Sequence, residues 1–122
     1  MPAKKALTFH QKFKVKPLSA NKMFYRAKQL TKEYRQFREF MYEEIPNRSK
    51  AWPFKEDDHL DFTVMVGLSS KLADVDNVIK PLLDTFQLLF EFNDKYVYKV
   101  TIEKEIVKKG SEYIDVKVKE YK

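Results

Sequence analysis

Apolar and polar residues alternate in four segments of the chain, and alternation with a period of two predicts β-strands. In residues 7–15 the apolar face consists of Leu7, Phe9, Phe13 and Val15. Residues 60–68 alternate in the same way, from Leu60 to Leu68. Residues 96–107 and 112–118 are the last two segments, and the turn-forming residues between them predict a hairpin.

Two longer segments have the apolar spacing of amphipathic helices. In residues 27–45 the apolar positions are Leu30, Tyr34, Phe37 and Met41. In residues 77–90 they are Ile79, Leu82, Leu83, Phe86 and Phe90. Pro81 removes a backbone hydrogen bond from the second helix, so this helix either begins after Asn77 or has an irregular first turn.

The remaining stretches, residues 16–25 and 46–59, contain prolines, serines and asparagines and are predicted to be loops. The elements therefore follow one another as strand, helix, strand, helix, strand, strand. This order predicts an α+β fold, with a mixed sheet of about four strands and two main helices. Residues 1–122 have the length of a single domain.

The composition narrows the class of protein. Hydrophobic residues make up 43% of the chain and aromatic residues 15%, which suits a folded domain. Without cysteine, the chain cannot form disulfides or thiolate zinc sites, and we expect a cytoplasmic protein. We also expect no membrane partner, because no run has the length of a membrane-spanning helix. Two glycines are too few for a glycine-rich phosphate loop.

The net charge of +6 is unevenly distributed. Residues 1–59 have 14 Lys or Arg and 7 Asp or Glu, whereas residues 60–122 have 10 and 11. This asymmetry predicts a basic surface that binds a polyanion beside a carboxylate site. The alternative is ordinary surface charge that keeps the protein in solution.

Asp74 and Asp76 stand just before the second predicted helix. Residues two apart point to the same side of an extended chain but about 200° apart on a helix, so the pair converges only if it precedes the helix. Converging carboxylates repel each other, and a divalent cation relieves the repulsion. Mg²⁺ prefers one or two carboxylates with water and phosphate oxygens, so the pair is a candidate magnesium site.

Other roles for the aspartate pair remain open. An aspartate before a helix often caps it, which contributes about 1 kcal/mol. A calcium loop of the EF-hand type is excluded, because Val78 stands at a ligand position and the central glycine is missing. Zinc is disfavoured, because His10 and His59 are the only histidines and lie far apart in the chain.

Lys80, Asp84 and Asp94 are candidates to join the pair. Lys80 follows Asp76 by four residues and precedes Asp84 by four, so a helix would place the three on one face. The alternative for Lys80 and Asp84 is a surface ion pair. Asp94 belongs to the predicted loop after the helix, which can fold back toward the pair, and its alternative role is that of a turn residue.

Two stretches, DVDNVIKPLLDTF (residues 74–86) and NDKYVYKVTIEK (residues 93–104), together resemble the RusA family of Holliday junction resolvases. The family's signature is D-x-D-N-x-x-K, a further aspartate in the following helix, and an acidic pair before a strand. The residues that match its first part are Asp74, Asp76, Asn77, Lys80 and Asp84. Residues 17–25, PLSANKMFY, also look like the family's N-terminal Pro-Ser-x-Asn segment.

The resemblance implies a RusA-like fold and a homodimeric, Mg²⁺-dependent endodeoxyribonuclease of a bacterium or a phage, with Mn²⁺ as a substitute. Such an enzyme resolves four-way DNA junctions in recombination and repair by paired phosphodiester hydrolysis. By position, Asp74, Asp76 and Asp94 would bind the metal ion, and Lys80 would be the catalytic lysine. The supporting residues would be Asn77, Asp84 and Asn93.

Basic residues outside the motif are candidates to bind DNA phosphates, and the alternative for each is a solvated surface position. They are Lys12, Lys14, Lys16, Lys28, Lys32, Arg35 and Lys71. Because Asn93 stands where the family has an aspartate, a second function is open: a branched-DNA-binding protein without catalysis. Trp52, in the second predicted loop, either contacts a base or seals the edge of the core.

Overall fold

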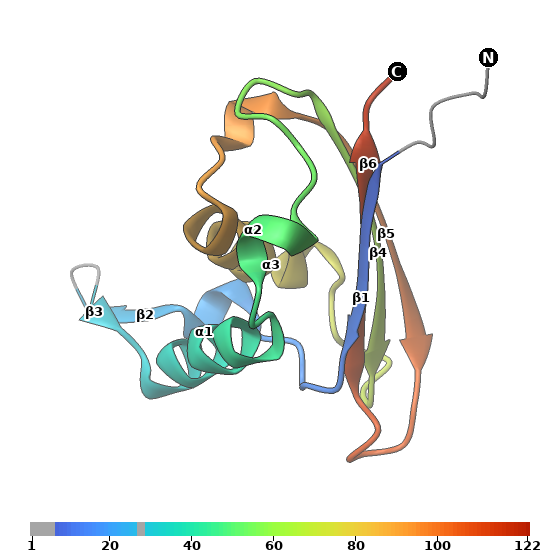
Figure 1. The fold of residues 1–122 in the computed structure, drawn as a ribbon. Helices are drawn as coiled ribbons and strands as arrows, with labels where there is room; N and C mark the ends of the chain where they lie inside the picture. Colours follow the sequence, from blue (N-terminus) through green and yellow to red (C-terminus); the bar gives the residue numbers. More distant parts are fainter. Residues whose placement is uncertain (1–6, 27–28) are drawn as a thin grey trace.

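The chain folds into a four-stranded sheet with helices on one face only (Figure 1). The computed structural model describes residues 7–26 and 29–122. The strands of the sheet are β1 (Thr8–Phe13), β4 (Leu60–Leu68), β5 (Val97–Ile106) and β6 (Tyr113–Glu120), in the order β1-β6-β4-β5. β6 runs antiparallel to β1 and β4, whereas β5 runs parallel to β4.

The helical layer contains α1 (Lys32–Glu44), α2 (Arg48–Ala51) and α3 (Asp76–Phe90). Two short 3₁₀ helices, η1 (Ala20–Lys22) and η2 (Asp94–Tyr96), and a small hairpin of β2 (Phe24–Arg26) and β3 (Gln29–Leu30) complete the described part. The predicted α+β class is therefore confirmed, with a mixed sheet of four strands.

The parallel pair β4–β5 determines the direction of α3. Parallel neighbours need a crossover connection, because the chain has to return to the starting edge of the sheet before the second strand begins. α3 is this connection. Its first residue, Asp76, therefore lies toward the end of β4, and its last residue, Phe90, lies toward the start of β5.

The core lies between the sheet and the helices, as the apolar patterns predict. Phe62, Val64 and Val66 of β4 are buried, as are Leu82 and Phe86 of α3. Leu7 is the exception, because it stands just before β1 and its side chain is 61% exposed. On the other face of the sheet, positions such as Thr63 and Lys117 are exposed, and among the described residues no helix covers them.

The first predicted helix was placed too early in the sequence. Residues 29–30 belong to β3, and α1 begins at Lys32. Thr31 ends the extended segment and caps the helix, because its side chain accepts a hydrogen bond from the backbone N–H of Tyr34 (3.1 Å). The predicted loop 46–59 contains the single turn α2, which the polar sequence does not reveal.

Candidate functional site

A cavity of about 830 Å³ lies where β4 ends and α3 begins, and we call it the β4–α3 cavity. In open α/β units, ligands bind at the carboxyl ends of parallel strands, because helix N-termini and loops meet there. The polar and proline residues that line the cavity include Lys16, Pro17, Ser19, Asn21, Lys22, Glu33, Ser69, Ser70, Asp74, Asn77 and Glu112. The rest of the lining is mainly apolar, and it includes Val15, Leu18, Phe37, Phe40, Leu68, Leu72 and Val78.

Two of the three stretches that resemble the family, residues 17–25 and 74–86, reach this cavity, whereas residues 93–104 do not. Pro17 and Leu18 are buried, Ser19 caps η1 by accepting the N–H of Asn21 (3.3 Å), and η1 packs against α3. Asp74 and Asn77 of the second stretch also line the cavity. Residues more than fifty positions apart in the sequence thus line the same cavity.

The aspartate pair does not precede the helix as an extended segment. Val75, between the two aspartates, has helical backbone angles (φ −66°, ψ −34°), and Asp76 is the first residue of α3. A helical residue between them directs the two side chains apart, as the spacing rule requires. Asp74 lines the β4–α3 cavity, and both carboxylates are exposed to solvent.

Pro81 lies inside α3 and leaves the first turn irregular. Having no N–H, it cannot bond to the carbonyl oxygen of Asn77, its partner four residues earlier. The N–H of Val78 instead bonds to the oxygen of Val75 (3.1 Å), a 3₁₀-type contact. Of the two expected arrangements, the structure shows the helix with an irregular first turn, because α3 begins at Asp76, ahead of the proline.

Lys80 and Asp84 share a helix face, as predicted. The Lys80 ammonium lies 3.5 Å from a carboxylate oxygen of Asp84, and the lysine side chain is 62% exposed. The pair is one to two turns along α3 from Asp76.

Asp94 lies at the other end of α3. It begins η2, and its backbone N–H donates to the side-chain oxygen of Gln87 in the last turn of the helix (3.2 Å). Asn93 caps η2 by accepting the N–H of Lys95 (3.0 Å). Because α3 has 15 residues, at about 1.5 Å per residue its two ends are roughly 22 Å apart. One chain does not bring Asp94 to the aspartate pair.

A metal site of three side chains is not formed within residues 7–26 and 29–122. No group of three His, Cys, Asp or Glu residues there is close enough to hold an ion. Sequence reasoning missed two carboxylates of the β4–α3 cavity, Glu33 and Glu112. The pKa of Glu112 is lowered, chiefly by backbone hydrogen bonds, including one from the N–H of Gly110 (2.7 Å). No local spacing signal points to either residue.

The turn before Asn93 begins at Glu91. Glu91 ends α3 in the left-handed conformation (φ 55°, ψ 42°), in which glycine is favoured. Its N–H bonds to the oxygen of Gln87 (2.8 Å). A glutamate therefore adopts the left-handed backbone conformation that glycine usually adopts at the end of a helix.

The predicted DNA-binding residues do not form one surface. Lys16 lines the β4–α3 cavity, whereas Lys12 lies over the ring of Tyr113 (4.3 Å) on the uncovered face of the sheet. Lys28 falls outside the described residues. The remaining candidates are exposed: Lys14 after β1, Lys32 and Arg35 on α1, and Lys71 in the loop after β4.

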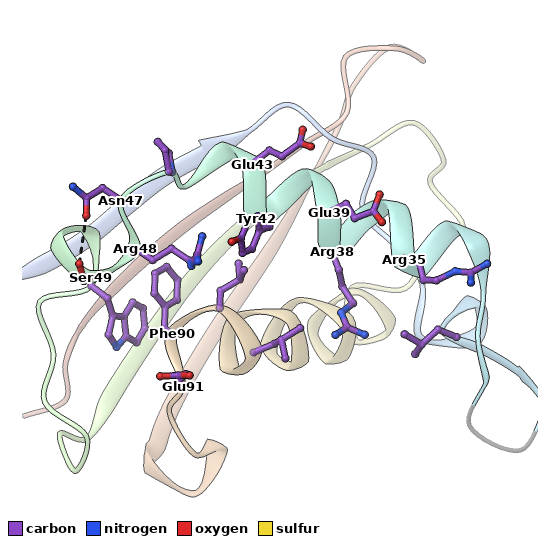
Figure 2. Close-up of a pocket in the computed structure, with 15 residues that line it drawn as sticks. Arg35, Arg38, Glu39, Tyr42, Glu43, Asn47, Arg48, Ser49, Phe90 and Glu91 are labelled. Atoms are coloured by element: carbon purple, nitrogen blue, oxygen red, sulfur yellow. Dashed lines mark hydrogen bonds between the residues drawn. The ribbon is translucent and has the colours of Figure 1, made fainter.

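A second cavity, of about 1020 Å³, lies between α1, α2 and α3 and contains two arginines that the sequence did not single out, Arg38 and Arg48 (Figure 2). Arg35, Arg38 and Arg48 line it, and we call it the arginine cavity. The Arg48 guanidinium lies 3.9 Å from the centre of the Tyr42 ring. In the part of the chain that the structure describes, none of the three arginines is in an ion pair. Their positions depend on the packing of three helices.

Trp52, at the edge of the arginine cavity, seals the core. Its ring stacks on Phe90 (centroids 4.3 Å apart, 11° between planes) and on Phe92 (5.2 Å, 14°). It also packs against Phe54 and Phe62. Of the two expected roles, these contacts support the structural one.

Comparison with models of known protein families finds no match, and comparison with curated proteins finds none either. The resemblance to RusA resolvases therefore rests on the motif residues alone. Over the described ranges of the chain, every helix is too short or too polar to cross a membrane.

Proposed function

We propose that the protein is a Mg²⁺-dependent, structure-selective endodeoxyribonuclease that cuts branched DNA, including four-way junctions, as a homodimer. The observation that carries the proposal is the meeting of two motif segments at the β4–α3 cavity. Ser19 and Asn21 line it from the segment after β1, and Asp74 and Asn77 line it from the segment after β4. A cavity at the carboxyl end of a parallel strand pair, with lysines among its lining residues, is suited to a phosphate-bearing substrate.

Of the aspartate pair, only Asp74 lines this cavity, so one chain supplies only part of a Mg²⁺ site. The carboxylates of Asp74 and Asp76 are both exposed, and the helical backbone of Val75 directs them apart. Mg²⁺ takes one or two carboxylates and completes its shell with water and phosphate oxygens. When bound, the ion would supply positive charge at the scissile phosphate and a water of lowered pKa.

The chain's own residues supply the remaining functions of the site. Asp84 forms an ion pair with the Lys80 ammonium on one face of α3. From there the ammonium would provide positive charge for the pentavalent phosphorus of the transition state. The N-terminus of α3 contributes backbone N–H groups with partial positive charge. Lys16 and Lys22 line the cavity and are suited to the flanking phosphates, as are the arginines of the arginine cavity.

A labelled four-way junction tests the proposal. The wild type should nick strands in symmetric pairs when Mg²⁺ is added. Asp74→Asn and Asp76→Asn should each bind the junction in a gel-shift assay and lower the cleavage rate at least about 100-fold, because the carboxylate charge is lost. Asp57→Asn, an exposed aspartate in a loop away from the cavity, is the matched control. Cleavage that survives both motif substitutions would rule out the metal assignment.

A second function, binding of branched DNA without catalysis, is favoured by the position of Asp94 at the far end of α3. Under this function the wild type binds the junction, and neither Mg²⁺ nor Mn²⁺ produces nicks at any pH. The same gel separates the two functions, because only the first gives products that disappear in the Asp74 variant.

A further inference from the structure

Leu72 stands in the turn after β4 and, at 92%, is the most exposed large apolar side chain in the described part of the protein. A single exposed leucine is common on protein surfaces, but the backbone of this turn is fixed on both sides. The Lys104 ammonium donates to the carbonyl oxygens of Lys71 (3.1 Å) and Ala73 (3.0 Å). The N–H of Leu72 itself donates to the hydroxyl of Ser70 (3.2 Å). An apolar side chain is therefore held out into solvent on a fixed support.

Leu72 also lines the β4–α3 cavity, whose size and lining suit a flat organic group. Cavities that bind small molecules have volumes of about 300–1,000 Å³ and are mainly apolar, with a few polar groups. The β4–α3 cavity has about 830 Å³, and Phe37 and Phe40 contribute aromatic rings to its lining. Asn21 and Asn77 also line it, and their amides are suited to the hydrogen-bonding edge of a nucleic-acid base.

The charges around the cavity suit a nucleotide. Lys16 and Lys22 line the cavity, and Lys71 is exposed in the turn after β4. Lysines at such positions neutralise phosphates and position a strand without reading its sequence. Glu33 and Glu112 also line the cavity, and a carboxylate accepts a hydrogen bond from the amino group of cytosine. The lining therefore combines groups for a base with groups for the flanking phosphates.

We infer that the β4–α3 cavity takes one base extruded at the branch point of the DNA, and that Leu72 enters the base stack where this base leaves it. The inference rests on the proposed function, because Asp74 of the candidate nuclease site lines the same cavity. Leucine is among the apolar side chains that proteins insert between base steps to unstack them. Extrusion costs least where pairing and stacking are already disturbed, as they are at a branch. Occupation of the cavity would therefore direct the nuclease to branched DNA.

Four-way junctions that carry 2-aminopurine at each branch-point position in turn test the inference, in EDTA so that the DNA stays uncut. Stacking quenches the fluorescence of 2-aminopurine, so saturating wild-type protein should raise it at least about twofold at one position. Leu72→Ala should lose most of this rise at saturation, whereas Leu72→Met keeps a long apolar side chain and should restore it. Leu88→Ala is the matched control and should keep the full rise, because Leu88 is an exposed leucine (55%) that lines the arginine cavity instead.

Acrylamide quenching shows where the extruded base lies. A base inside the cavity is shielded from solvent, so acrylamide should quench it at least about twofold less than the same base in a free single strand. Equal quenching would place the base in solvent and overturn its binding in the cavity.

The remaining outcomes separate this inference from the proposed function. No rise at any branch-point position with the wild type, or an equal rise with Leu72→Ala, overturns the inference. Cleavage in Mg²⁺ without a fluorescence rise in EDTA would leave the nuclease standing and remove the inserted leucine. A rise that depends on Leu72, without cleavage in Mg²⁺, would support the inference and contradict the nuclease.

Discussion

Asp74 and Asp94 lie at opposite ends of α3. Asp74 stands two residues before the helix, and the backbone N–H of Asp94 is bonded to Gln87 in its last turn. The crossover between two parallel strands enforces this separation, because the helix has to run the length of the sheet. The motif residues of one chain therefore lie at two separate places.

Mixing two inactive variants tests whether the site is shared. If Asp74 of one subunit acts with Asp94 of the partner subunit, Asp74→Asn and Asp94→Asn should each be inactive alone. A heterodimer of the two contains one site with both aspartates intact. The mixed sample should therefore regain single-strand nicking of the junction, measured on a denaturing gel. Random pairing makes half of the dimers heterodimers, each with one intact site of two, so the rate should reach about a quarter of the wild-type rate.

The control for this experiment is a mixture of Asp74→Asn with Asp76→Asn. These residues belong to one segment, so every site in that heterodimer keeps a defect and no activity should return. Equal recovery in both mixtures would contradict a shared site.

Lys80 should affect catalysis more than stability. The Lys80–Asp84 pair is exposed, and such pairs contribute about 0.3–0.5 kcal/mol. Lys80→Ala should change the free energy of unfolding by no more than this amount, but should lower the cleavage rate at least about tenfold, because a positive charge near the phosphate is lost. Asp84→Ala breaks the same ion pair and keeps the lysine. If both variants cut equally slowly, the ion pair rather than the lysine charge is responsible.

Trp52 should contribute to stability and not to DNA binding. Trp52→Ala removes the ring stacked on Phe90 and Phe92 and should lower the free energy of unfolding by about 2–4 kcal/mol. Trp52→Phe keeps part of the stack and should lower it by about half as much. Urea denaturation followed by circular dichroism measures both. A loss of junction binding by a fully folded Trp52→Phe would indicate a base contact instead.

Tyr113 should lose its proton at a higher pH than an ordinary tyrosine among the seven of the chain. Its hydroxyl donates a hydrogen bond to Glu105, and this bond raises the pKa of Tyr113 to about 12. In an ultraviolet pH titration, Tyr113→Phe should remove one late transition. Glu105→Gln should move the pKa of Tyr113 back toward 10, because the carboxylate that opposes ionisation is gone. The pKa of Tyr34 is also raised, mainly by burial, and serves as the internal reference.

The raised pKa of Tyr113 also makes its contribution to the free energy of unfolding depend on pH above about pH 10. The pKa of Tyr113 is higher in the folded state than the ordinary value of 10.0, so its contribution to stability is fully present below pH 10. This contribution is lost as the pH rises through about 12. The difference in unfolding free energy between the wild type and Tyr113→Phe should therefore be constant up to pH 10 and shrink above it.

The sequence determined the elements and the faces that they bury. Alternation in residues 60–68 and helical spacing in residues 77–90 arise from contacts between residues at most four positions apart, so local periodicity is enough to show them. The buried faces of Phe62 and Phe86 follow the predicted pattern. The ion pair between Lys80 and Asp84 also follows from spacing alone.

Only the tertiary structure decided which of these elements meet. Because β4 and β5 pair in parallel, Asp94 and Asp74 lie at opposite ends of α3. Because η1 packs on α3, Ser19 lies in the β4–α3 cavity together with Asp74. Trp52 joined the core because Phe90 and Phe92 lie beside it. Strand pairing and helix packing depend on the combined burial of residues far apart in the chain, which no local pattern records.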